Sequence, residues 1–298
     1  MDGGVGDHMA SLVAIKYIKS QYPYVEPLVW TPDYLTAFSA HVLPGIEVRS
    51  YTEMKTQYNK DLYTKTTKWD SIISPMKIHL LDYAFLKLCD ENPDITYKNS
   101  LRIYPDAIDT SMLAMPKDYA VVTAGFTAKA REFRAPYINE ICKYLVSRNV
   151  TPVFLGATKT ETGAKHIIEG NFSGDINFKL GVNLLNRTSL LQAAKIMGNA
   201  KAVLGVDNGL LHVAGYTNVA IIGGFPSVSP EIRMPVRNNI LGYNYYPVVP
   251  DEGKGCNFCQ ERTNFLYGHD YRECIYKDDR AINQMTAEKF INKLEIVL

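Results

Sequence analysis

The sequence predicts an α/β protein whose parallel sheet is covered by helices on both faces, a doubly wound arrangement. From Tyr119 onward, short apolar runs alternate with amphipathic segments, which is the pattern of repeated βα units. The stretch 203–225 follows the order strand, tight turn, short helix and strand. At 298 residues the chain has room for two domains of ordinary size.

The stretch around Asp207 is the most informative part of the sequence. Residues 202–206 form an apolar run typical of a buried parallel strand, Asp207-Asn208-Gly209 breaks it, and residues 210–216 have helical spacing. A polar turn between a strand and a helix start presents free N–H groups and the positive end of the helix dipole, which favours an anion. Alternatively, Asp207 only caps the helix and His212 is structural. This stretch alone does not separate the two interpretations.

The chain opens with Gly3, Gly4 and Gly6 and then Asp7, ahead of a segment with the apolar spacing of a helix. Glycines in such a turn allow a ligand or another backbone to come close. A glycine turn of this kind normally follows a strand, and the sequence leaves no room for one. The first domain therefore either lacks its opening strand or is completed differently.

The next elements also alternate between strands and helices. We expect strands at 25–30 and 46–51, helices at 32–41 and 77–89, a polar segment at 52–75, and an irregular connection at 90–116.

The second half continues with clearer signals. The turn at 156–163 is expected to lead from a strand into a helix, and Ser189 and Gln192 form a capping box. The remaining predicted strands lie at 119–124, 152–155 and 219–222, and the remaining helices at 137–148, 189–197 and 286–298.

Composition narrows the class of protein. The apolar fraction of 46% and charged fraction of 21% are typical of a soluble globular protein, and the net charge of +1 gives no general attraction to nucleic acid or a membrane surface. No apolar run is long enough to span a membrane, and no signal-peptide pattern opens the chain. Five cysteines, an odd number, indicate reduced thiols. These features together predict a cytoplasmic protein.

Five motifs in order give the chain a family resemblance. They are Gly3-Gly-Val-Gly-Asp7, residues 79–88, Arg131-Glu-Phe133, Arg187-Thr-Ser-Leu190 and Asp207-Asn-Gly-Leu-Leu-His212. The chain resembles the heptosyltransferase-like glycosyltransferases (glycosyltransferase family nine), which have the GT-B fold of two Rossmann-like domains facing a cleft. The resemblance implies an acceptor-side domain at 1–112, a nucleotide-sugar domain at 113–285 that includes the cysteine segment 255–274, and a terminal helix at 286–298.

The resemblance also implies an activity. The family transfers a sugar, often a heptose, from a nucleotide diphosphate to an acceptor hydroxyl, with inversion and without a required metal. Asp7 falls on the position of the general base, a role that a positioned carboxylate can fill; alternatively it caps the first helix. The acceptor is left open among a polysaccharide, a lipid-linked molecule and a protein. Other interpretations are a GT-B epimerase or hydrolase acting on sugar nucleotides, and a binding module without catalysis.

The expected donor site gathers cationic side chains and helix starts, because a departing diphosphate needs its charge stabilised. Asn208 stands where the family usually has Thr or Ser. The donor-binding residues that the resemblance implies are Gly4, Gly6, Lys129, Arg131, Thr188, Ser189, Asp207, Asn208, Gly209 and His212.

A cysteine segment near the end of the second domain suggests a structural metal. Cys256 and Cys259 have the two-residue spacing of a metal knuckle, and Cys274 and His269 could complete a tetrahedral site for zinc or iron. The alternative is a set of reduced thiols packed in a loop.

Overall fold

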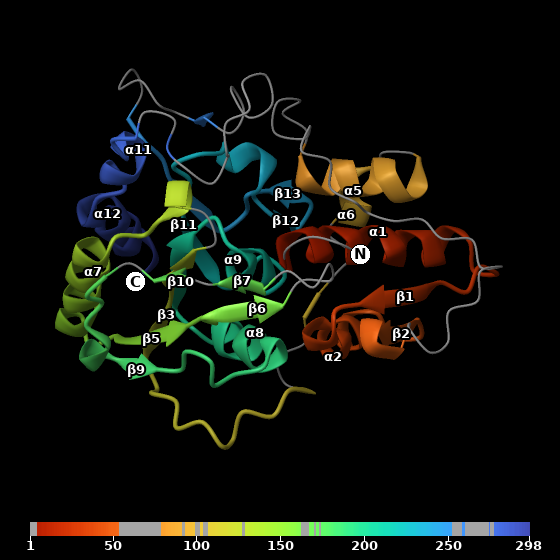
Figure 1. The fold of residues 1–298 in the computed structure, drawn as a ribbon, viewed down its shortest axis with the longest axis horizontal. Coiled ribbons are helices and arrows are strands. Elements are labelled where there is room, and N and C mark those ends of the chain that lie inside the picture. The colour runs from red at the N-terminus through yellow and green to blue at the C-terminus, as the bar shows by residue number, and fades with distance from the viewer. Residues whose placement is uncertain are drawn as a thin grey trace.

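The computed structural model describes residues 5–53, 79–90, 93–98, 102–103, 107–126, 129–161, 167–169, 171–172, 174–251, 258–259, 274 and 277–298. An amino-terminal part lies beside a larger carboxyl-terminal part (Figure 1). The larger part is built on a sheet, and α1 of the smaller part runs outward from it between α5 and β1 (Figure 1).

The larger part contains a parallel sheet of six strands in the order β9-β5-β3-β10-β11-β14. Three successive strands lie on one side of the centre and the next three on the other, so the chain reverses direction across the sheet between β3 and β10. In this Rossmann order, ligands bind at the reversal, outside the carboxyl ends of the strands. The strands are β3 (Tyr119–Thr123), β5 (Thr151–Leu155), β9 (Val182–Asn183), β10 (Ala202–Val206), β11 (Ala220–Gly224) and β14 (Tyr245–Val248).

Helices cover both faces of this sheet, as the doubly wound prediction requires. On one face α7 (Ala135–Ser147) and α12 (Ala287–Val297) pack together over one buried cluster, where the Phe133 and Phe290 rings stack at 4.7 Å. On the other face α8 (Leu190–Gly198) and α9 (Gly209–Ala214) belong to a second cluster. Apolar side chains alternate between the two clusters along β3 and β10, which explains why both strands are apolar throughout.

The amino-terminal part is organised around α1 (Val5–Gln21), which is buried on most sides and packs against α5 and α9. Its apolar residues, such as Leu12, belong to the same cluster as Val213 of α9. A helix that is apolar nearly all round is a buried helix. The other elements of this part are the parallel pair β1 (Leu28–Thr31) and β2 (Glu47–Ser50), and the helices α2 (Asp33–Val42), α5 (Leu80–Cys89) and α6 (Ile95–Lys98).

Short elements complete the carboxyl-terminal part. They are β4 (Gly125–Phe126), η2 (Lys129–Arg131), β6 (Lys159–Glu161), β7 (Ile167–Glu169), β8 (Asn171–Phe172), η3 (Phe178–Leu180), η4 (Pro230–Ile232), β12 (Val236–Arg237), β13 (Ile240–Leu241) and α11 (Arg280–Asn283).

One predicted element was wrong. The turn at 156–163 was expected to open a helix, but its described residues lead into β6, which pairs antiparallel with β7. Thr158 and Thr160 favour this outcome, since β-branched side chains are better accommodated in extended backbone than in a helix. Of the polar segment predicted at 52–75, only Thr52 and Glu53 lie within the described residues.

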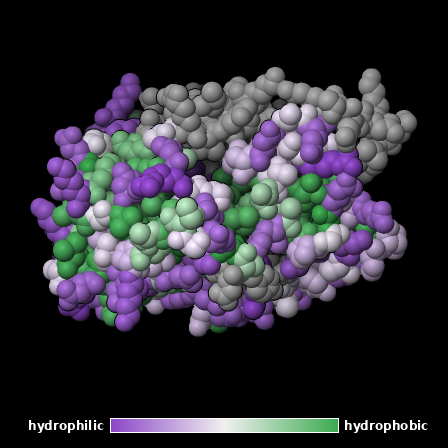
Figure 2. Space-filling view, turned by 90° about the horizontal axis from the view of Figure 1, so that it is seen from below, coloured by the Kyte–Doolittle hydropathy of each residue, from purple (hydrophilic) through white to green (hydrophobic). Residues whose placement is uncertain are grey.

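The outer surface is mixed. On the face shown in Figure 2, hydrophobic residues form small patches separated by hydrophilic ones. Within the described residues, no helix is both long enough and apolar enough to cross a membrane.

Candidate functional site

The centre of the candidate site is Asp207, which follows β10 directly and is 4% exposed. Its Oδ2 lies 3.3 Å from Nη1 of Arg131 and 4.0 Å from Nε of Arg233, and its Oδ1 lies 3.4 Å from Nε2 of His212. We call these four residues the Asp207 cluster. The cluster lies beside the point of the sheet where the strand order reverses, because β10 borders that point.

The electrostatics of the cluster keep Asp207 ionised. Burial by itself would raise the pKa of its carboxyl, but the charge of Arg131, the hydrogen bond from His212 and the charge of Arg233 outweigh burial and hold that pKa below its usual range. Two guanidinium groups therefore face one carboxylate. The arginine side chains are 18% and 15% exposed, so a ligand can reach them.

Asn208 is the N-cap of α9. Its Oδ1 accepts hydrogen bonds from the N–H groups of Leu210 at 3.0 Å and Leu211 at 3.2 Å. Its Nδ2 donates toward the carbonyl oxygen of Gly125 at 3.1 Å, and toward the hydroxyl and carbonyl oxygens of Thr123 at 3.2 and 3.3 Å. The cap of this helix is therefore Asn208 and not Asp207.

Two glycines bring the start of α1 against the start of α9. A Cβ built on Gly6 would lie 2.5 Å from Cδ2 of His212, and one built on Gly209 would lie 2.7 Å from Cβ of Val5. Both positions need glycine because no side chain fits between the helices. This contact places Asp7, in the first turn of α1, next to the residue that touches His212.

The surroundings of Asp7 are partly described. Its carboxylate adds to the effect of burial in raising the pKa of Tyr34 to about 12. Its carbonyl accepts a hydrogen bond from the Ser11 hydroxyl at 3.0 Å. Gly4, the other glycine expected at this site, lies outside the described residues.

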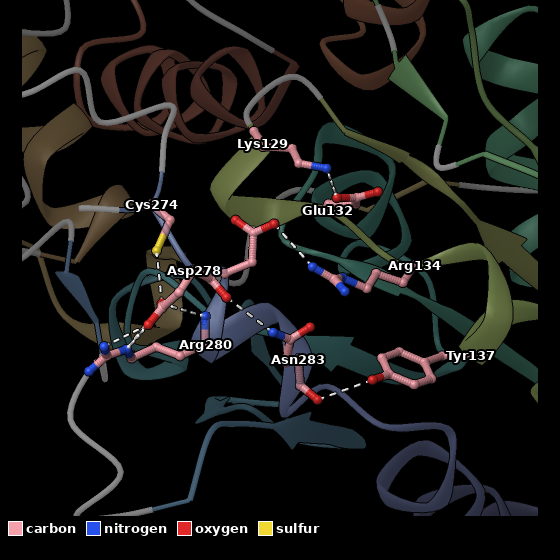
Figure 3. Close-up of polar contacts among 9 residues, drawn as sticks. Lys129, Glu132, Arg134, Tyr137, Cys274, Asp278, Arg280 and Asn283 are labelled. Atoms are coloured by element: carbon pink, nitrogen blue, oxygen red, sulfur yellow. Dashed lines mark hydrogen bonds and ion pairs between the residues drawn. The ribbon is translucent and has the colours of Figure 1, made fainter. Parts of the chain in front are cut away.

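The other residues expected at the donor site are Lys129, Thr188 and Ser189. The ammonium group of Lys129 forms an ion pair with Glu132, and both side chains are seen in Figure 3. Ser189 caps α8, with its hydroxyl accepting from Gln192 N–H at 3.2 Å, and Thr188 precedes it. The strand before α8 is β9, which β3 and β5 separate from β10 in the sheet, and α8 itself packs against α9.

The described part of the cysteine segment lies beside α11. Cys259 is buried against Ala281, and Sγ of Cys274 lies 3.9 Å from Oδ1 of Asp278 (Figure 3). Neither sulfur is in a disulfide within the described residues. A tetrahedral sulfur site needs four ligands, and these two could supply half of them. Within the described residues no group of three ligands is gathered, and the other two expected ligands, Cys256 and His269, lie outside them, so the metal site stays a prediction.

Sequence reasoning missed Arg233. It lies directly after η4, in the loop that follows β11, the next strand beyond β10. An arginine soon after the carboxyl end of a central strand is a usable signal, because such loops converge on one edge of the sheet.

A Rossmann-order sheet with arginines at its point of reversal is typical of α/β proteins that bind nucleotides. The family profile of Glycosyltransferase family 9 (heptosyltransferase) matches residues 47–258, and the chain belongs to this family. It is a glycosyltransferase with the GT-B fold. The chain matches no curated protein sequence.

Three solved structures share the fold at low sequence identity. The iron-containing dodecameric glycosyltransferase TibC from enterotoxigenic E. coli H10407 has 15% identity and a TM-score of 0.69, over 99% of this chain and 74% of that one. E. coli heptosyltransferase WaaC with ADP has 11% identity and a TM-score of 0.60, and the match covers 100% of this chain and 98% of that one. E. coli ADP-heptose lps heptosyltransferase II has 13% identity and a TM-score of 0.56, and the match covers 99% of this chain and 96% of that one.

Proposed function

We propose that this glycosyltransferase moves a heptose-type sugar from a nucleoside diphosphate to an acceptor hydroxyl, with inversion at the anomeric carbon. The observation that supports this most is the Asp207 cluster, with two arginines facing one buried carboxylate at the reversal point of the sheet. Heptosyltransferases among the structural relatives include TibC in complex with ADP-D-beta-D-heptose. We therefore propose ADP-heptose as the first donor to test.

The cluster matches the chemistry of a departing diphosphate. As the bond between the anomeric carbon and the diphosphate oxygen breaks, negative charge grows on the leaving group, and fixed cations lower the energy of that charge. Arg131 and Arg233 can donate charge-assisted hydrogen bonds to it, and His212 can add a further donor. These side chains can supply the positive charge that a divalent ion would supply, so we propose that transfer needs no metal. Transfer that stops in EDTA and recovers with an added divalent ion would contradict this.

Asp7 is the proposed general base. An acceptor hydroxyl must lose its proton while its oxygen attacks the anomeric carbon, and a nearby carboxylate can take that proton. The contact of Gly6 with His212 supports this role, since it holds the first turn of α1 beside the Asp207 cluster. A displacement with inversion requires the base and the leaving-group cations to act on opposite faces of the anomeric carbon, and here they come from different parts of the chain.

We also propose the domain roles that the family resemblance implies. Residues 1–112 would bind the acceptor, residues 113–285 the donor, and residues 286–298 would form the terminal helix. The acceptor would be a polysaccharide, a lipid-linked molecule or a protein, and the reaction would take place in the cytoplasm.

Donor binding tests the proposal first. We expect one nucleotide in a thermal-unfolding panel of ADP-heptose, ADP and common UDP- and GDP-sugars to raise the melting temperature selectively. A ligand that binds only the folded state stabilises it by about 2.7 kcal/mol at a hundred times its Kd.

The variant Asp7→Asn tests the general base. It should bind that donor as the wild type does and lose transfer. Transfer retained in Asp7→Asn would remove Asp7 as the base, and wild-type turnover of the donor without any acceptor would favour a hydrolase or epimerase.

Metal analysis of the purified protein tests the cysteine segment. A zinc or iron content near one per chain, lost in Cys259→Ser, would support a structural site. A preparation free of both metals would leave Cys259 and Cys274 as buried reduced thiols.

A further inference from the structure

We propose that Asn208 is a positioning residue, which together with Asp207 holds β4 and η2 against the start of α9 and so fixes Arg131 for the donor. This inference rests on the proposed function. It replaces direct donor contact as the role of the Asn208 side chain.

The hydrogen bonds of Asn208 leave no capacity for a ligand. A side-chain amide has two N–H donors and an oxygen with two lone pairs. Both lone pairs are used by the N–H groups of α9, and the two N–H groups face three acceptors on Thr123 and Gly125. A phosphate oxygen could bind this amide only by displacing one of those bonds.

Asn208 and the acceptors of its amide lie on opposite sides of the reversal point. Thr123 ends β3 and Gly125 begins β4, whereas Asn208 follows β10. Gly205 lies opposite Thr123 in the ladder, and its missing side chain leaves room for the Thr123 hydroxyl, which donates to the carbonyl oxygen of Leu204 at 3.2 Å. The Asn208 amide therefore joins the ends of β3 and β10 where the ligand site of such a sheet forms.

Asp207 and Asn208 contact two elements that are close in sequence. Asn208 bonds to Gly125 of β4, and Asp207 is 3.3 Å from Arg131 of η2. Two neighbouring residues thus hold both elements, and η2 carries a donor-site cation. A serine or threonine at this position, the usual family residues, would keep the helix cap but is too short to bridge to Gly125.

Two substitutions separate the helix-capping role of Asn208 from its hydrogen bonds to Thr123 and Gly125. Asn208→Asp keeps an excellent N-cap but turns an oxygen toward three acceptors, and Asn208→Ser keeps the cap without adding charge. In both we expect faster hydrogen exchange at amides of β4 and η2 and unchanged exchange in α9. This measurement needs no ligand. Unchanged exchange at β4 and η2 in both variants would overturn the inference, whatever the fate of the proposed function.

Binding then tests the link to Arg131. If wild-type protein binds ADP-heptose, Asn208→Ser should raise its Kd and KM by about tenfold to a hundredfold, because small misplacements of an oriented group cost that much. Wild-type protein that does not bind would count against the proposed donor and leave the exchange result to decide this inference.

A double-mutant cycle identifies how Asn208 acts. If it acts through Arg131, adding Asn208→Ser to Arg131→Gln should cost much less than the same change in the wild type. Additive losses would indicate direct donor contact and overturn the positioning role.

Discussion

At the scale of single residues, Arg233 is the side chain whose role depends most on the three-dimensional structure. Its Nε lies 4.0 Å from Oδ2 of Asp207, and its side chain is 15% exposed. We expect Arg233→Met to weaken binding of the donor nucleotide by tenfold or more, since a hydrogen bond to a charged group contributes about 1.5–3 kcal/mol. Titration calorimetry with the nucleotide identified in the donor panel measures this change.

A control distinguishes donor contact from support of Asp207. Arg233→Lys keeps the charge but loses the planar fork of donors, so it should recover part of the lost affinity. If Arg233→Met lowers the melting temperature and leaves nucleotide affinity unchanged, Arg233 only neutralises Asp207.

The sequence identified most of this cluster but not its internal roles. Asp207, His212 and Arg131 were predicted at the donor site, and the structure brings all three together. Asp207 was considered as the helix cap, but the hydrogen bonds from Leu210 and Leu211 show that Asn208 is the cap, and its bonds to Thr123 and Gly125 reach across the sheet. Local sequence cannot show which carbonyl groups of another strand a side chain will meet, and the same limit explains why Arg233 was missed.

At the scale of elements, the start of α8 offers the clearest stability test. Ser189 and Gln192 form the capping box that the sequence predicted, with bonds of 3.2 and 2.9 Å. Ser189→Ala should reduce the free energy of unfolding by about 1 kcal/mol, the usual loss for an N-cap. Urea unfolding at constant m-value measures this change.

A matched variant asks whether this helix start also faces the donor, as the sequence predicted. Ser189→Asp keeps a good cap but places a negative charge where a phosphate would bind. Stability should stay close to that of the wild type, while nucleotide affinity should fall. Unchanged affinity would place the donor away from α8.

The strength of each local signal explains which elements were predicted well. The central strands were found to within a residue or two, because apolar runs such as those of β3 and β10 are required by burial on both faces. The helix predicted after the turn at 156–163 was wrong. The glycines of this turn resemble those of a helix start, whereas the antiparallel pairing of β6 with β7 depends on residues farther along the chain. Register and strand order are long-range properties, and spacing alone does not determine them.

At the scale of the whole molecule, His79 joins the amino-terminal helices to the carboxyl-terminal part. Its Nδ1 accepts from the N–H of Leu81 at the start of α5, and its Nε2 lies 2.9 Å from the carbonyl oxygen of Met234. Both bonds form together only in the neutral tautomer with the proton on Nε2. Protonation would turn Nδ1 into a donor and remove the cap of α5, so this junction is predicted to be sensitive to acid.

The direction of the pH dependence follows from the pKa of His79. Burial is the main cause that holds this pKa below its ordinary value of 6.5; the Met234 carbonyl and Asp82 oppose the shift, and Lys98 and Arg233 add to it. Below pH 6.5, His79 is therefore protonated to a greater extent in the unfolded chain than in the folded chain. The contribution of His79 to the free energy of unfolding is complete above pH 6.5 and is lost as the pH falls. Asp207 remains ionised throughout, because its pKa lies below its usual range.

His79→Asn isolates this effect. Asparagine can still cap α5 through its Oδ1, but it does not titrate and is too short to reach Met234. Urea unfolding between about pH 5 and pH 8 should show a smaller loss of stability toward acid in this variant than in the wild type. Parallel pH curves for the two proteins would mean that His79 titrates alike in the folded and unfolded chains, and that acid leaves this junction between the two parts intact.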